Sequence, residues 1–244
     1  MNKFSTLPPG HTLSPTEDGS VTLFSERFQE NCHSLSGAKS ETIHQYVQGC
    51  EIEKKILELN PLHILEIGFG LGVGFLTTLE VLKDSPHQWT FTSVEIDPEL
   101  INWFFREHFP GKEIKNFTLS QDNWTLQILI GDARKTLPEF VKENSLTFHA
   151  IYQDAFSPKK NPTLWTKEWF AFLKTCSHES AILSTYSSSN SIRKSLVESG
   201  WKLYEGGKFG HKRSSTRARL SGDTSPEILL NLSRSPVESL KDER

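Results

Sequence analysis

A run of alternating glycines is the feature that most restricts how this chain can fold. Residues 66–74 read EIGFGLGVG and overlap the end of an apolar stretch, residues 63–68, that predicts a buried strand. Residues 73–83 then favour a helix. Glycines allow the backbone to turn sharply and to approach a ligand closely, because no Cβ stands in the way. The run therefore predicts a strand–turn–helix unit with a ligand at the turn; the alternative is a tight turn that binds nothing.

The spacing of these glycines separates classes of nucleotide ligand. A dinucleotide-binding GxGxxG turn needs a third small residue, but counting from Gly68 reaches Val73 and counting from Gly70 reaches Phe75. A phosphate-binding P-loop is excluded because no Gly-Lys-Ser/Thr follows the glycines. Glu66, two positions before Gly68, favours S-adenosylmethionine as the ligand.

Short apolar runs alternate with helical segments from residue 62 onward. We expect strands at 63–68, 89–96, 126–132, 148–154 and 181–186, and helices at 73–83, after Pro98, at 133–141 and at 191–200, where Gly200 is the C′ residue. Such alternation implies a mostly parallel sheet. Residues 201–206 and 215–221 predict a terminal hairpin. The expected fold is α/β, a Rossmann-like class I S-adenosylmethionine-dependent methyltransferase with an N-terminal extension.

The chain divides into three parts on this interpretation. Residues 1–61 form the N-terminal extension, with a loose arm over 1–20, a strand at 21–28 and helices within 40–60. Residues 62–221 form the Rossmann-like domain. Residues 222–244 are polar with scattered proline and serine, and we expect a flexible tail there.

Composition narrows the class of protein. With 36% hydrophobic and 23% charged residues the chain is neither disordered nor membrane-embedded. No apolar run approaches the roughly 20 residues that span a bilayer, and the N-terminus lacks the apolar core of a secretory signal. The three cysteines are far apart, which predicts reduced thiols in a cytoplasmic protein and no metal site. The net charge of −3 gives no bulk attraction to nucleic acid, so an RNA contact would need a local basic patch.

Three acids stand at the ends of successive predicted strands, where open α/β sheets bind ligands. We expect Glu95 to accept hydrogen bonds from the ribose hydroxyls, Asp132 from the adenine amino group, and Asp154 to lie beside the sulfonium. One such acid alone would be read as a helix cap, but three in register with the glycine turn indicate a ligand. The predicted cofactor-binding residues are Glu66, Gly68, Gly70, Gly72, Glu95, Asp132, Ala133 and Asp154.

Residues 152–165 are the most specific stretch of the sequence. They read YQDAFSPKKNPTLW, which resembles the D-x-F-x-P-x-K-N-P-x-x-W segment in the methyltransferase domain of MnmC, the bacterial tRNA 5-methylaminomethyl-2-thiouridine biosynthesis protein. Shorter likenesses lie within 18–44, at 185–187 and at 208–213, so the resemblance runs from about residue 18 to residue 220.

This resemblance implies an activity and partners. The substrate would be the anticodon loop of tRNA, where the aminomethyl group of the wobble uridine is methylated on nitrogen. Bifunctional members of the family add a C-terminal FAD-dependent oxidase that prepares this amine. Only 24 residues follow position 220 here, so we expect a monomeric relative without the oxidase. Either a separate enzyme supplies the amine or the substrate differs.

Candidate residues for chemistry and substrate binding follow from the same segment. Asp154 is the catalytic candidate, first as the group that orients the amine and second as a general base. Phe156 could stack on a splayed base, whereas Trp165 favours core packing. The predicted substrate-binding residues are Phe156, Lys159, Lys160, Lys212 and Arg213; the last four would contact phosphates together with Lys208, Arg217 and Arg219, and the alternative is a solvated hairpin face.

Two other functions remain open on the sequence. An aminopropyltransferase of polyamine synthesis shares this fold and an acid after the fourth strand. A non-catalytic RNA-binding protein could use a retired methyltransferase fold, although intact acids at three strand ends argue against it. An NAD-dependent dehydrogenase is disfavoured by the failed glycine fingerprint.

Overall fold

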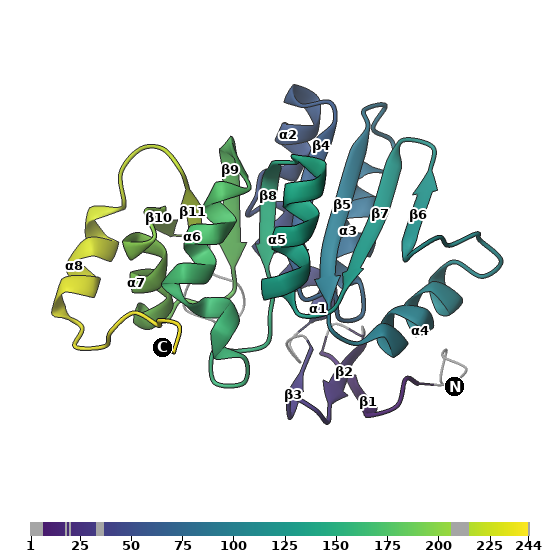
Figure 1. Cartoon of the computed structure of the whole chain (residues 1–244), viewed down its shortest axis with the longest axis horizontal. Coiled ribbons are helices and arrows are strands. Elements are labelled where there is room, and N and C mark those ends of the chain that lie inside the picture. Colours follow the sequence, from purple (N-terminus) through teal and green to yellow (C-terminus); the bar gives the residue numbers. More distant parts are fainter. Residues whose placement is uncertain (1–6, 18, 20, 33–36, 206–214, 244) are drawn as a thin grey trace.

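The computed structural model describes residues 7–17, 19, 21–32, 37–205 and 215–243 (Figure 1). Within them an eight-stranded sheet has the order β10-β11-β9-β8-β4-β5-β7-β6. Its strands are β4 (Leu62–Ile67), β5 (Trp89–Glu95), β6 (Thr118–Gln121), β7 (Trp124–Ile130), β8 (Phe148–Gln153), β9 (Ser177–Thr185), β10 (Lys202–Glu205) and β11 (Thr216–Arg219). The neighbouring strands from β9 to β7 pair in parallel, whereas the pairs β6–β7, β9–β11 and β10–β11 are antiparallel. The predicted parallel sheet and its terminal hairpin are confirmed.

Helices cover both faces of this sheet, which is why its central strands are apolar on both sides. One core contains residues of η1 (Ile43–Val47), α2 (Ile52–Glu58), α3 (Val73–Leu82) and α4 (Pro98–His108), and α1 (Ala38–Thr42) packs on α3. The other contains residues of α5 (Ala133–Asn144), η2 (Pro162–Trp165), α6 (Lys167–Thr175), α7 (Asn190–Glu198) and α8 (Pro226–Arg234). Successive side chains of a strand point to opposite faces, so Ile64 enters the first core and Leu65 the second.

A second, three-stranded sheet is formed by residues that precede the first helix in the sequence. It consists of β1 (His11–Pro15), β2 (Val21–Ser25) and β3 (Glu30–Asn31), all antiparallel. In Figure 1 it lies beneath the lower edge of the large sheet. The expectation of a loose arm is wrong for residues 11–15, because His11–Pro15 pairs residue by residue with Val21–Ser25.

The expectation of a flexible tail is likewise wrong for most of residues 222–244. Helix α8 begins with Pro226 at its first turn, where proline is tolerated, and it buries Ile228 and Leu232. Those two residues are spaced i and i+4 and so share a helix face, a signal that the polar composition of the segment obscured. Strand β6 and helix α6 were not expected from the sequence. No helix within the described residues is long and apolar enough to cross a membrane.

Candidate functional site

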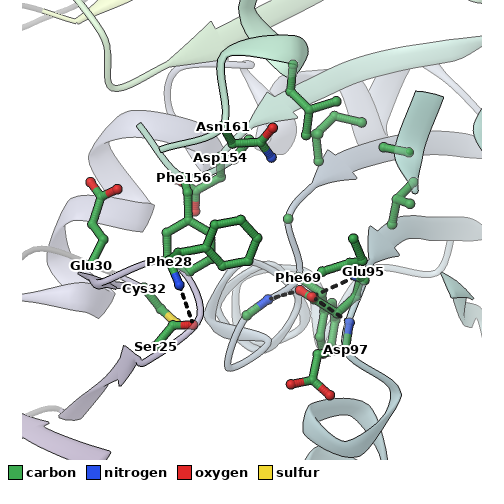
Figure 2. A pocket seen from close by; sticks show the side chains of 18 of the residues that line it. Ser25, Phe28, Glu30, Cys32, Phe69, Glu95, Asp97, Asp154, Phe156 and Asn161 are labelled. Carbon is green, nitrogen blue, oxygen red and sulfur yellow. Dashed lines mark hydrogen bonds between the residues drawn. The ribbon is translucent and has the colours of Figure 1, made fainter. Parts of the chain in front are cut away.

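A pocket of about 590 Å³ lies at the carboxyl edge of the large sheet, within the size range of small-molecule sites. One wall comes from the turns that follow β4, β5, β7 and β8, and the facing wall comes from the small sheet and α1. Figure 2 shows Phe28 and Phe156 on one side of this pocket, with Glu95 and Asp97 on the other.

The glycine turn after β4 forms the floor of the pocket. Gly68 has a φ of +92°, and a Cβ on it would lie 2.9 Å from the carbonyl oxygen of Asp154. The backbones that follow β4 and β8 therefore pass so closely that only glycine fits between them. Gly68 and Gly70 line the pocket, as predicted for a turn that approaches a ligand.

Glu66 and Gly72 lie behind the turn and do not line the pocket. The Glu66 carboxylate is 1% exposed and accepts a 2.9 Å hydrogen bond from the Ser93 hydroxyl. A Cβ on Gly74 would lie only 1.9 Å from Glu66 Oε1, so the carboxylate supports the first turn of α3. Burial, followed by the charge of Asp154, raises the pKa of Glu66 well above its usual range. Glu66 is thus placed to shape the turn.

Glu95 ends β5 and faces the pocket with its carboxylate held by backbone donors. Its Oε1 accepts from the N–H groups of Ile96 and Asp97, at 2.7 and 3.1 Å, and its Oε2 accepts from Gly70 N–H at 3.0 Å. Burial raises the pKa of Glu95, and the three backbone bonds oppose that shift. An ionised carboxylate can accept about four hydrogen bonds, so Glu95 keeps capacity for a ligand hydroxyl.

Asp132 and Asp97 both line the pocket and both cap helices. The Asp132 side chain accepts from Arg134 N–H at 3.0 Å at the start of α5, and Asp97 accepts from Glu99 N–H at 2.9 Å at the start of α4. Such caps are the ordinary role of an acid after a strand. Here the same geometry also directs Asp132, with its neighbour Ala133, to the pocket edge.

Asp154 directly follows β8 and contacts the N-terminal extension. The hydroxyl of Tyr46, on η1, donates to Asp154 Oδ1 at 2.6 Å. Burial and the neighbouring Asp154 carboxylate raise the pKa of Tyr46 well above its usual value, so the phenol remains a donor. The two residues are separated by 108 positions in the sequence, which is why sequence patterns did not pair them.

Phe156 stacks on Phe28 of the small sheet's β2–β3 connection, with ring centroids 4.3 Å apart and planes 21° from parallel. Beside this pair, Glu30 accepts from the backbone N–H and the hydroxyl of Ser157, at 3.2 and 2.9 Å. The Arg27 guanidinium lies 5.4 Å from the Phe28 ring centroid. The small sheet is therefore joined directly to the segment that follows Asp154.

The segment after Asp154 is also held from its other side. Tyr186 donates its hydroxyl to the Ala155 carbonyl at 2.9 Å, and the Trp165 indole N–H donates to the Phe156 carbonyl at 2.9 Å. Trp165 is fully buried, which confirms the core packing expected for it. Phe156 is consequently positioned by its backbone as well as by its ring.

None of the predicted basic residues within the described ranges lines the pocket. Lys159 and Lys160 are exposed and lie outside its lining. Lys208, Lys212 and Arg213 lie outside the described residues. Arg219 is exposed, and its guanidinium lies over the Tyr204 ring.

Sequence reasoning missed the lining contributed by the N-terminal extension and part of the lining from the connections that follow β5, β8 and β9. These residues include Arg27, Phe28, Glu30, Glu41, Tyr46, Asp97, Asn161 and Tyr186. Asn161 stands in the segment that carries the family resemblance, and Asp97 precedes a proline at a helix start, so both carried a signal. The residues of the extension carried none that fixes their position.

Comparisons with known proteins identify the family to which the chain belongs. The profile of a family described as S-adenosyl-L-methionine-dependent methyltransferase matches residues 99–221. An uncharacterised protein of Methanocaldococcus jannaschii is 29% identical in an alignment of 224 positions that covers 87% of this chain and 60% of that protein. The tRNA 5-methylaminomethyl-2-thiouridine biosynthesis bifunctional protein MnmC of Burkholderia multivorans is 30% identical over 244 residues, covering 88% of this chain and 35% of that protein.

A solved structure extends the likeness to three dimensions. MnmC2 from Aquifex aeolicus superposes with a TM-score of 0.80 at 29% identity, covering 96% of this chain and 78% of that one. The resemblance inferred from residues 152–165 and the predicted fold class are both confirmed. The chain spans 60% of the archaeal relative and about a third of the curated MnmC proteins.

Proposed function

This chain belongs to the family of S-adenosyl-L-methionine-dependent methyltransferases, and on that premise we propose that it methylates the aminomethyl nitrogen of a modified wobble uridine in tRNA. Its cofactor is S-adenosyl-L-methionine. The names of the similar MnmC proteins, which describe tRNA 5-methylaminomethyl-2-thiouridine biosynthesis, support the choice of substrate.

The pocket lining suits this cofactor. Gly68 and Gly70 line the pocket with bare backbone, and Glu95 has acceptor capacity for a ribose hydroxyl. Asp132 is available at the pocket edge to accept from an adenine amino group. We propose these residues, with Ala133 and Asp154, as the cofactor contacts; Glu66 and Gly72 would act through the shape of the turn. When bound, S-adenosyl-L-methionine supplies an activated methyl group on a positively charged sulfur.

The other side of the pocket suits a base that carries an amine. Phe28 and Phe156 offer stacking surfaces of the kind that single-stranded RNA bases occupy. Glu30, Glu41 and Asp154 give this side negative charge, and Arg27 is the one arginine among the described lining residues. A cationic alkylamine is attracted to such a surface.

Asp154 is proposed to orient the amine for transfer. In-line attack needs a neutral nitrogen near the methyl group, and correct positioning of reactants can lower a barrier by roughly 7–11 kcal/mol. A carboxylate also stabilises the ammonium form, so the amine must lose its proton before transfer. Asp154 can accept an N–H hydrogen bond that directs the lone pair toward the methyl group, and a role as the proton acceptor is secondary.

The observation that carries the proposal is that Asp154 and the stacked Phe28–Phe156 pair share one pocket with Glu95 and the glycine turn. Nucleoside mass spectrometry of tRNA from a strain lacking the gene tests it. Accumulation of the unmethylated aminomethyl uridine is expected, and the purified protein should methylate that tRNA. An unchanged nucleoside profile would contradict the proposal, and transfer to putrescine from decarboxylated cofactor would favour an aminopropyltransferase.

Lys159 and Lys160 are proposed to contact tRNA phosphates, because they are exposed in the segment that carries Asp154. We expect Lys159→Glu with Lys160→Glu to weaken tRNA binding at least about tenfold and to reduce its salt dependence. Filter binding at several salt concentrations measures this. Lys142→Glu changes an exposed lysine on α5 and is the control; equal weakening by that variant would contradict a local contact.

A further inference from the structure

Tyr46 makes the hydrogen bond that most directly links the N-terminal extension to the proposed chemistry. Resting on the proposed function, we infer that Tyr46 is a positioning residue that holds the Asp154 carboxylate in the orientation needed to direct the acceptor amine. Its hydroxyl lies 2.6 Å from Asp154 Oδ1 and 3.4 Å from the Gln153 carbonyl. A phenol has one proton, and the shorter distance together with the charge of the acceptor assigns that proton to Asp154.

Tyr46 is itself fixed in place. Its side chain is 3% exposed, and its ring stacks on Tyr152 of β8 with centroids 5.1 Å apart. The preceding residue, Gln45, donates its side-chain amide to the Ser184 hydroxyl at 3.0 Å, and that hydroxyl donates to the Gln45 carbonyl at 2.6 Å. Helix η1 is therefore attached to both β8 and β9, so the Tyr46 hydroxyl cannot follow a rotating carboxylate.

The helical form of this segment supports a functional reason for the placement. Residues Ile43–Val47 form a π-helix, and π-turns are uncommon and frequent at functional sites. The wider turn belongs to the same five residues that carry Tyr46 inward, next to Glu41 and Thr42, which line the pocket from α1.

Donation by Tyr46 has two consequences for Asp154. It sets the plane of the carboxylate through Oδ1, and so it sets the direction of Oδ2. It also stabilises the charged form without cancelling the charge, because a phenol is neutral. Burial keeps the phenol protonated over the working pH range. Among the described residues, the charge of Asp154 contributes to the raised pKa of Cys32, Tyr46, Glu66 and Tyr186, so a change in that charge would affect all four groups.

The substitution Tyr46→Phe removes the hydroxyl and keeps the ring. Tyr152→Phe is the matched control, because Tyr152 is equally buried and its hydroxyl contacts only Thr78 Oγ1, at 3.1 Å, among the bonds described. We expect Tyr46→Phe to lower kcat roughly tenfold with KM for tRNA nearly unchanged, and to move the acid limb of the pH profile to higher pH. Tyr152→Phe should leave kcat and the acid limb of the pH profile unchanged.

A double-mutant cycle separates positioning from packing. In the Asp154→Ala background, Tyr46→Phe should cause no further loss of kcat, because no carboxylate remains for Tyr46 to hold. Full additivity of the two losses, or an equal loss in Tyr152→Phe, would overturn the inference. Thermal unfolding of all variants shows whether any loss comes from misfolding, and the pH profile reports the contact in whatever fraction remains folded.

The inference and the proposed function fail in different ways. If the unmodified protein does not methylate the aminomethyl tRNA, the proposed function fails. The role of Tyr46 is then decided by calorimetric titration with S-adenosyl-L-methionine as a function of pH. As pH is lowered, we expect the affinity of Tyr46→Phe for the cofactor to begin to fall at a higher pH than that of the unmodified protein or of Tyr152→Phe. Three superimposable curves of affinity against pH would overturn the inference.

Discussion

Asp154 is the side chain on which the proposed methyl transfer most depends, because it faces both the cofactor turn and the aromatic pair. We expect Asp154→Asn to lower turnover at least about tenfold, or about 1.4 kcal/mol in activation free energy. Single-turnover assays with radiolabelled methyl donor measure this. Asp122→Asn makes the same chemical change in the exposed β6–β7 turn and should leave turnover unchanged. A folded Asp154→Asn protein with normal turnover would remove Asp154 from catalysis.

Gly68 gives a second prediction at the level of a single residue. An added Cβ would lie 2.9 Å from the Asp154 carbonyl at a φ of +92°. We therefore expect Gly68→Ala to weaken S-adenosyl-L-methionine binding at least about tenfold by displacing the turn from Asp154. Gly111→Ala is the control, because its φ is +75° but nothing lies within 4 Å of the added atom. Calorimetry compares the two, and equal affinities would show that the close approach is dispensable.

At the level of elements, the strand ends opposite the pocket carry a histidine cluster. His149 of β8 lies between His63 of β4, on which it stacks with ring centroids 5.7 Å apart, and His178 of β9, whose ring is tilted at a centroid distance of 4.6 Å. Burial, with the charges of His178, His63 and Lys55, lowers the pKa of His149 to about 4. Its Nδ1 accepts from His63 N–H at 3.0 Å, so the neutral ring is part of the packing between strands.

This cluster predicts a loss of stability in acid. An unfolded histidine binds its proton near pH 6.5, whereas folded His149 binds one only near pH 4, so falling pH favours the unfolded chain across that window. His149→Asn keeps an acceptor for His63 N–H and cannot titrate. We expect its free energy of unfolding to fall less between about pH 7 and about pH 5 than that of the unmodified protein. Urea denaturation at both pH values measures this, and parallel losses would contradict it.

At the scale of the whole molecule, the C-terminal segment joins elements on one face of the large sheet. Arg134, beside the pocket residues Asp132 and Ala133, donates to the Thr163 carbonyl, the Thr166 hydroxyl and the Asp242 carboxylate. The Leu240 carbonyl accepts from the Lys167 backbone N–H, and the Leu240 N–H donates to the Ser195 hydroxyl. Residues 235–243 therefore connect α5, α6 and α7 near the predicted adenine side of the pocket.

Removing residues 235–244 should lower the free energy of unfolding and also weaken S-adenosyl-L-methionine binding, because α5 loses this support. Asp242→Asn isolates the ion pair, and we expect a loss of only about 0.2–1 kcal/mol because the pair is partly exposed. Thermal unfolding and calorimetry on both proteins check this. A truncated protein with unaltered stability and affinity would contradict a supporting role.

The sequence alone determined the large sheet apart from β6, and the strand ends that form one side of the site. Strand and helix periods are local patterns, and a parallel sheet brings the ends of successive strands to one edge. Glu95, Asp132 and Asp154 could therefore be placed together without coordinates. Buried Trp165 and the hairpin of β10 with β11 followed from the same local rules.

Only the tertiary structure decided the other side. Phe28, Glu30 and Tyr46 contact residues that follow β8. Their partners are Phe156, Ser157 and Asp154, each more than a hundred positions later in the chain. Their placement depends on where the small sheet and η1 dock, and docking is set by packing between distant surfaces. The tertiary structure also distinguished Glu66 from Gly68, two residues of one motif. Glu66 supports the turn from behind, whereas Gly68 lines the pocket, because adjacent strand positions and the turn itself point in different directions.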